Sequence, residues 1–183
     1  MWEDPKLIEI LKRGGVVVMP TDTIYGLAGV ALNEPTVNRI YTVRKRNPEK
    51  PCIILIGAAE DLEKFSIDLS LEQKKVLETF WPGPVSIILD CEERALAYLH
   101  CGTKTLAFGL PASESLGKLL LETGPLIAPS ANPEGLPPAK NITEAKNYFG
   151  EAVDLYIDGG EIVGKPSKLI KLSRDGSFVV LRD

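Results

Sequence analysis

Short apolar runs rich in β-branched residues alternate along the chain with segments whose apolar positions recur at helical spacing. The first helix is expected to follow Asp4 as N-cap, with Pro5 at its first position, and to end at Gly14 and Gly15. Further helices are expected over residues 34–45, 58–65, 71–80, 114–122 and 143–149. Strands are expected over residues 16–19, 52–56, 85–89, 105–110, 126–128, 153–157, 168–172 and 178–181.

This order of elements predicts an α/β fold. Helices that cross between strands favour parallel neighbours, whereas Asp175 and Gly176 predict a hairpin turn before the last strand. We therefore expect a twisted, mixed (parallel and antiparallel) sheet with flanking helices. The chain has 183 residues and lacks internal repeats and linker-like stretches, so residues 1–183 are expected to form one domain.

Composition and charge narrow the classes of function. Lys and Arg total 21 against 25 Asp and Glu, so the net charge of -4 does not favour nucleic acid as the main ligand. No apolar run approaches the roughly 20 residues of a membrane span, and the N-terminus lacks a signal-peptide pattern. We therefore expect a cytoplasmic protein without membrane contact.

Cysteine and histidine are too few for several kinds of site. The 3 cysteines have no CxxC spacing, which argues against a disulfide framework and a cysteine-rich zinc site. The single histidine, His100, excludes the H-E-x-x-H zinc arrangement. His100 precedes Cys101, but adjacent residues are not thereby within hydrogen-bond reach, so buried packing or a wet loop is the simpler interpretation.

Candidate chemistry begins at residues 20–27, which read PTDTIYGL after a predicted buried strand. The segment places the hydroxyls of Thr21, Thr23 and Tyr25, with one carboxylate, at the strand's exit, where α/β proteins often bind ligands. The alternative is structural, because threonine and aspartate side chains also form turns and caps and Tyr25 can pack in the core.

A group of cations follows the helix predicted over residues 34–45. It consists of Arg44, Lys45, Arg46 and Lys50. A helix C-terminus favours cations by about 0.3 to 1 kcal/mol, which suffices for a solvated surface cluster without a ligand. The functional alternative is a clamp on phosphates, which the arginine fork and the compact lysine charge both suit.

Residues 129–138 form the third candidate segment, directly after a short predicted strand. Four prolines and one glycine make it a rigid polar loop, and a preset loop lowers the ordering cost of binding. Ser130 and Asn132 are therefore candidates for ligand contact as well as for turn formation.

One motif imitates a phosphate loop. Gly159 and Gly164-Lys165 have the GxxxxGK spacing, but Pro166 stands where the magnesium-binding Ser or Thr is needed. The residues that follow alternate like a strand, whereas a phosphate loop leads into a helix.

Taken in order, these blocks resemble the YrdC domain family. They are PTDTIYGL, the RKR run with Lys50, WPGP, the Ser-Ala-Asn loop and a late DGG followed by GKPS. Single blocks are unspecific, whereas the ordered set is specific and covers nearly the whole chain. The resemblance implies a YrdC-like fold and an L-threonylcarbamoyladenylate synthase. This nucleotidyltransferase makes threonylcarbamoyl-AMP and pyrophosphate from L-threonine, bicarbonate and ATP, with Mg2+.

The resemblance also implies partners and alternatives. The product would pass to tRNA threonylcarbamoyl transferase proteins, which form threonylcarbamoyladenosine next to the anticodon. Longer family members append a second domain, which this chain is expected to lack. Two alternatives remain open: a module that binds tRNA or double-stranded RNA, and a catalytically degenerate homologue.

By the same resemblance, Thr23 and Ser167 are implied to bind threonine, and no residue is implied to ligate a metal. Thr21, Tyr25 and Arg44 are additional candidates. Adenylyl transfer relies on positioning and on neutralising phosphate charge, so the scarcity of histidine is consistent with it. The positions implied to surround ATP are Arg46, Lys50, Thr105, Ser130, Asn132 and Arg182.

Three positions depart from the family's pattern. Arg44 stands where the family usually has lysine, and Lys168 replaces the usual threonine after the serine. Gly109 stands where the family typically has arginine. Losing a cation that pairs with a buried carboxylate or phosphate can cost several kcal/mol, so Gly109 motivates the degenerate alternative.

Overall fold

A nine-stranded sheet forms the centre of the computed structural model, which describes residues 1–183. Its order is β7-β1-β2-β6-β3-β5-β4-β8-β9. The strands are β1 (Val17–Pro20), β2 (Tyr25–Val30), β3 (Ile53–Leu55), β4 (Val85–Asp90), β5 (Thr105–Gly109), β6 (Leu126–Ile127), β7 (Leu155–Tyr156), β8 (Lys168–Leu172) and β9 (Phe178–Arg182). Three neighbouring pairs are parallel, namely β1 with β7, β3 with β5 and β4 with β8, and the other five are antiparallel. The predicted mixed sheet is therefore confirmed.

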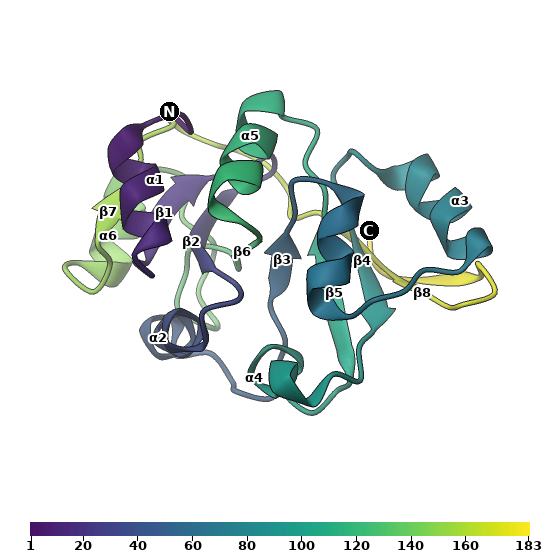
Figure 1. Ribbon diagram of the computed structural model, residues 1–183. Coiled ribbons are helices and arrows are strands. Elements are labelled where there is room, and N and C mark those ends of the chain that lie inside the picture. Colours follow the sequence, from purple (N-terminus) through teal and green to yellow (C-terminus); the bar gives the residue numbers. More distant parts are fainter.

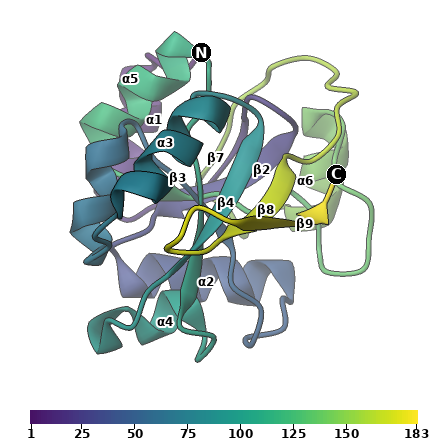
Figure 2. The same ribbon diagram turned by 90° about the vertical axis from the view of Figure 1, so that its right-hand side faces the viewer.

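Helices cover both sides of this sheet (Figure 1). They are α1 (Pro5–Lys12), α2 (Glu34–Arg44), α3 (Leu71–Phe80), α4 (Ala97–His100), α5 (Glu114–Thr123) and α6 (Ile142–Phe149), with the short 3-10 helices η1 (Ala59–Phe65) and η2 (Arg94–Leu96). In both ribbon views α1 and α5 lie on one side of the sheet and α2 and α4 on the other (Figures 1 and 2). None of the helices has the length and apolar character needed to cross a lipid bilayer.

The core is divided into two clusters because neighbouring residues of a strand point to opposite faces. In β1, Val18 belongs to the larger cluster, with residues of α2 and α4, whereas Val17 and Met19 belong to the smaller one, with Leu7 of α1 and Leu116 of α5. All five side chains are fully buried. The continuous apolar run at the start of β1 thus reflects burial on both faces.

Local signals place most elements correctly. Asp4 caps α1 by accepting a hydrogen bond from the Lys6 amide at 2.8 Å, and α3 spans the predicted residues. Residues 168–172 form β8, as the alternation indicates, so the imitation phosphate loop is not followed by a helix.

Two parts of the chain differ from the prediction. Residues 25–30 form β2, which the sequence analysis did not include, and residues 94–100 form η2 and α4. Strand β2 contains two glycines and an alanine, which are weak strand formers, so its conformation depends on antiparallel pairing with β1. Gly29 also faces α2, where an added Cβ would overlap Cγ2 of Thr36. Close helix packing, rather than strand propensity, explains the small residue.

Candidate active site

The three candidate segments meet around one cavity of about 330 Å3. The β1–β2 turn, the end of α2, the start of the 129–138 loop and the β8–β9 hairpin all line it, together with parts of β3, β4 and β5. Most of the residues singled out from the sequence also line it: Thr21, Thr23, Tyr25, Arg44, Arg46, Thr105, Ser130, Ser167 and Arg182. Lys50 and Asn132 do not, and their contacts are described below.

The segment predicted as a strand exit is the tight turn of the β1–β2 hairpin. The Thr21 hydroxyl donates to the carbonyl of Ile24 at 2.7 Å, so it closes the turn. The Thr23 hydroxyl contacts only that of Thr21, at 3.3 Å, and remains available to a ligand. Asp22, between them, is the one carboxylate along the cavity, and desolvation raises the pKa of its carboxyl group.

Tyr25 is fully buried and ties the cavity wall to a distant segment. Its hydroxyl accepts a hydrogen bond from the Gly159 amide at 2.8 Å and donates to the Gly160 carbonyl at 2.9 Å. Desolvation raises the pKa of the phenol. Because both hydrogen-bonding capacities are used, Tyr25 positions the segment that leads to Ser167, and its hydroxyl is not free for a ligand.

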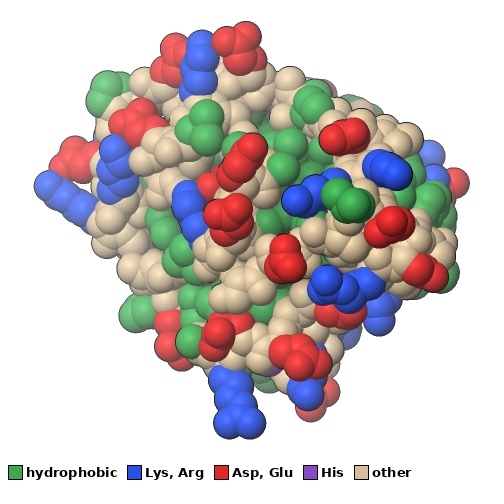
Figure 3. Space-filling view, turned by 45° about the vertical axis from the view of Figure 1, so that its right-hand side comes forward, with side chains coloured by type: hydrophobic (Ala, Val, Ile, Leu, Met, Phe, Trp, Pro, Cys, Tyr) green, Lys and Arg blue, Asp and Glu red, His purple; other side chains and the backbone are tan.

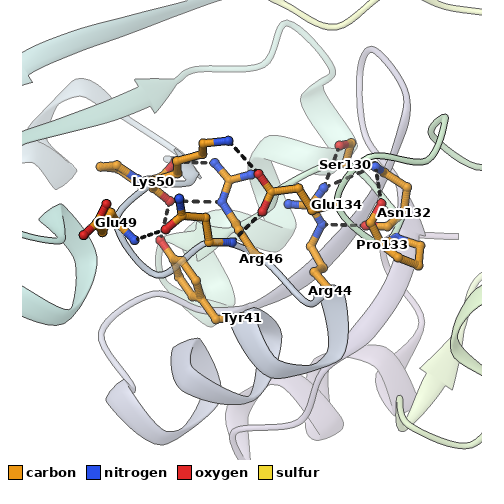
Figure 4. A network of polar contacts seen from close by, with 11 residues as sticks. Tyr41, Arg44, Arg46, Glu49, Lys50, Ser130, Asn132, Pro133 and Glu134 are labelled. Carbon is orange, nitrogen blue, oxygen red and sulfur yellow. Dashed lines mark hydrogen bonds and ion pairs between the residues drawn. The ribbon is translucent and has the colours of Figure 1, made fainter.

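Arg44 is only 2% exposed, so the interpretation of this residue as part of a solvated surface cluster is wrong. Its Nε donates to the Asn132 carbonyl at 2.9 Å, and its Nη2 lies 3.2 Å from both Ser130 Oγ and Asn132 Oδ1 (Figure 4). Its Nη1 is buried without a hydrogen-bond acceptor. Desolvation, followed by the nearby charge of Arg46, lowers the pKa of the guanidinium group. The 129–138 loop therefore holds the guanidinium group of Arg44, while its Nη1 has no hydrogen-bond partner in the protein.

The side chain of Asn132 contacts Arg44 and does not line the cavity. Its Oδ1 accepts from Arg44, and its Nδ2 donates to the carbonyls of Pro133 at 3.0 Å and Leu136 at 2.7 Å. Asn132 is buried and fixes the turn of the 129–138 loop. Asn132, predicted as an ATP contact, therefore supports Arg44 and does not itself line the cavity.

Arg46 and Lys50, two further cations of this group, have different surroundings. Arg46 donates to the carbonyls of Lys50 at 3.0 Å and Pro51 at 2.7 Å. Lys50 points away and forms an ion pair with Glu134 at 2.7 Å, as Figure 4 shows. The hydrogen bond from Lys50 lowers the pKa of the Glu134 carboxyl group. Only Arg46 of these two lines the cavity.

The far wall of the cavity combines a third arginine with two hydroxyls. Arg182 in β9 donates through Nε and Nη2 to the Ser167 carbonyl, at 3.1 and 2.8 Å. The hydroxyl of Ser167 lies 2.7 Å from that of Ser86. Desolvation lowers the pKa of Arg182. Ser86 was missed from the sequence, although a serine among the apolar residues of β4 is a usable signal.

Gly109 lies beside Ser86 in the sheet, since β5 pairs with β4 in that register. A Cβ at this position would lie 3.3 Å from Leu55 Cδ2 and 3.6 Å from Ser86 Oγ. The position therefore has room for a larger residue after a small adjustment of Leu55. With glycine at this position, Arg182 is the only charged residue on this wall of the cavity.

The side chains form neither a metal-binding group nor a hydrogen-bonded nucleophile and base from Cys101 and His100. No group of three or more His, Cys, Asp or Glu residues is arranged to hold a metal ion. His100 Nδ1 accepts from the Gly102 amide, and Cys101 lies 3.3 Å from the Tyr41 hydroxyl, so neither side chain hydrogen-bonds to the other. All three cysteines are free thiols.

Comparison with known proteins shows which proteins this chain is similar to. A family model for Sua5, YciO and YrdC proteins, described as telomere recombination, matches residues 9–183. The chain is 36% identical over 175 residues to the threonylcarbamoyl-AMP synthase of Pyrococcus abyssi. This alignment covers 94% of the present chain and 51% of the P. abyssi protein. The chain is 32% identical over 151 residues to the threonylcarbamoyl-AMP synthase of Halorhodospira halophila, covering 81% of this chain and 78% of that protein.

A solved structure shares the fold. The crystal structure of P. abyssi Sua5 complexed with L-threonine superposes with a TM-score of 0.86 at 33% identity, covering 96% of this chain and 52% of that one. The present chain thus spans about half the length of the P. abyssi protein that it matches.

Proposed function

Because this chain belongs to the Sua5/YciO/YrdC family, we propose that it is a threonylcarbamoyl-AMP synthase. The reaction would convert L-threonine, bicarbonate and ATP into threonylcarbamoyl-AMP, pyrophosphate and water, an adenylyl (nucleotidyl) transfer to the threonine carbamate. Relatives that bear this name, and a related structure that contains L-threonine, support the proposal. The product would supply the proteins that form threonylcarbamoyladenosine in tRNA.

One observation carries the proposal: three arginines line one cavity, and none of them has a carboxylate partner. Arg44, Arg46 and Arg182 donate only to carbonyl, amide or hydroxyl oxygens. Seven other cations of the chain do form ion pairs, none of them in this cavity. Buried charges are usually paired, and the buried Arg44 is not. With the half-buried Arg46 and the exposed Arg182 along the same cavity, the site suits an anion with several negative charges, such as a triphosphate.

The hydroxyl groups indicate where the amino acid would lie. Thr23 on the hairpin turn and Ser167 beside Ser86 face the same cavity as the arginines. Hydroxyls both donate and accept, and so suit the polar groups of threonine. With the threonine carbamate held there, its oxygen would attack the α-phosphorus, and the pyrophosphate would leave against the arginines.

The side chains do not fit a resident magnesium ion. Asp22 is the only carboxylate along the cavity, and Mg2+ prefers an octahedral set of oxygen ligands. We therefore expect magnesium to arrive with the ATP substrate. The protein's own contribution is the neutralisation of phosphate charge by guanidinium groups.

Purified protein given L-threonine, bicarbonate and MgATP should release pyrophosphate, and the release should depend on threonine. Thin-layer or mass-spectrometric detection of threonylcarbamoyl-AMP would identify the product. Release that ignores threonine, or no release by folded protein, would count against the proposal.

The catalytically degenerate alternative is tested at Gly109. If the missing arginine limits activity, Gly109→Arg should raise threonine-dependent turnover, and the modest contacts of a Cβ at this position make the variant feasible. Equal turnover in both proteins would show that glycine at position 109 is compatible with the reaction. Binding of RNA has less support, because Arg44 is buried and the exposed Lys50 is already paired with Glu134.

A further inference from the structure

A second cavity, of about 770 Å3, lies between η1 and α3, outside the candidate active site. Its floor is apolar and consists of Leu62, Ile67, Leu77 and Trp81, all buried in the core. This volume is within the range of about 300 to 1,000 Å3 typical of ligand pockets. We call it the η1–α3 groove.

The rim of the η1–α3 groove is acidic. Four carboxylates line it against one ammonium group, and none of these five side chains has an ion-pair partner in the chain. On the face shown in Figure 3, both acidic (red) and basic (blue) side chains border the apolar ones (green). An occupant should therefore be cationic at its edges and apolar along its centre. The charged rim residues are Glu60, Glu63, Asp68, Glu78 and Lys74.

The groove adjoins the active-site cavity. Leu110 lines both of them, and its carbonyl accepts a hydrogen bond from the Gly83 amide at 2.9 Å. Trp81 of the groove begins the turn whose Gly83 and Pro84 line the active-site cavity. Whatever occupies the groove lies directly beside the catalytic region.

We propose that the η1–α3 groove docks a basic amphipathic helix of a partner protein. Apolar side chains of that helix would contact the floor, and its lysines or arginines would face the carboxylates, which is the usual arrangement of a helix in a groove. An RNA backbone does not fit, because its phosphates would be repelled by the rim. The docking does not depend on the proposed reaction. If that reaction holds, the partner is placed to receive the acyl-adenylate before water hydrolyses it.

The probe is a fluorescein-labelled helical peptide of roughly 14 residues, about four turns, with leucine on one face and lysine on the other. Fluorescence anisotropy at low salt should show saturable binding to the full chain. The double substitution Glu60→Lys with Glu63→Lys should raise the Kd of the peptide at least about tenfold. The matched control, Glu92→Lys with Glu151→Lys, makes the same charge change at exposed positions outside the groove and should change it less than twofold.

Two further measurements separate the proposal from charge attraction alone. A peptide with serine in place of leucine should bind at least tenfold more weakly, and NMR shifts on peptide addition should concentrate at residues 66–69 and at the Trp81 indole. Any of three results would overturn the proposed docking. They are an equal loss of peptide affinity in both double variants, undiminished binding of the serine peptide, and NMR shifts located elsewhere. Competition by double-stranded RNA at the same residues would also overturn it. Pyrophosphate release by the groove variant should stay near the wild-type rate, so failure of docking and failure of the proposed function are measured separately.

Discussion

Replacing Arg44 by methionine tests whether its free nitrogen is an anion-binding group. Two opposing effects act on the protein without ligand. The change leaves oxygens of Asn132 and Ser130 without a donor, at about 1 to 3 kcal/mol for each unsatisfied buried group. It also removes a buried cation that has no carboxylate partner, whose desolvation costs several kcal/mol. The two terms largely offset each other, so we expect a net stability change of about 2 kcal/mol or less.

Ligand-induced stabilisation should change far more. A ligand at about 100 times its Kd stabilises the folded state by about 2.7 kcal/mol, which raises the Tm of a chain of this size by about 5 to 10 °C. Losing one charge-assisted hydrogen bond of about 1.5 to 3 kcal/mol weakens binding about 10- to 150-fold. At the same ligand concentration only about 0.3 to 1.4 kcal/mol of stabilisation would remain.

The assay is thermal unfolding with and without inorganic pyrophosphate. Arg94→Met is the control, since Arg94 is exposed and lies outside the cavity. We expect the control to keep the full Tm shift and Arg44→Met to lose at least half of it. A full shift in Arg44→Met would refute the assignment of Arg44 as an anion-binding residue.

Three other substitutions test particular contacts. Tyr25→Phe should cost about 0.5 to 1.5 kcal/mol by urea unfolding, since the amide of the exposed Gly159 loses its acceptor, and should raise the KM for threonine. A hydrogen bond from Arg39 lowers the pKa of Asp154 below 3.8, so its stabilisation is present above that pH and lost as the pH falls through the folded-state pKa. Asp154→Asn should therefore cost about 1 kcal/mol at pH 7, since solvent screens this half-exposed ion pair strongly, and progressively less as the pH falls through the folded-state pKa of Asp154. Gly117→Ala should stabilise the protein by about 0.5 to 1 kcal/mol and raise its Tm by a few degrees, because an added Cβ in α5 meets no atom within 4 Å; a lower Tm would contradict this.

The amino-acid sequence by itself determined the elements whose signals are local. Asp4 and Pro5 begin α1 because a side-chain cap and a fixed φ act within one turn of helix. The alternation over residues 168–172 indicates β8 because side chains of a strand alternate in direction. The motif residues of the cavity were also found from the sequence, since their chemical types recur in a specific order.

Only the tertiary structure decided which of these residues face the cavity. Strand β2 forms because β1 supplies its hydrogen-bond partners, which a segment rich in glycine cannot indicate alone. Proximity in sequence does not predict the contacts of Arg44, Lys50 and Asn132. Arg44 is buried against the 129–138 loop, where Asn132 accepts its hydrogen bond. Lys50 instead forms an ion pair with Glu134. The burial and orientation of these side chains depend on how the end of α2 packs against the 129–138 loop. The hydrogen bond between Arg44 and Asn132 joins residues that are 88 positions apart. Such contacts depend on the packing of the whole sheet and are not encoded in any one segment.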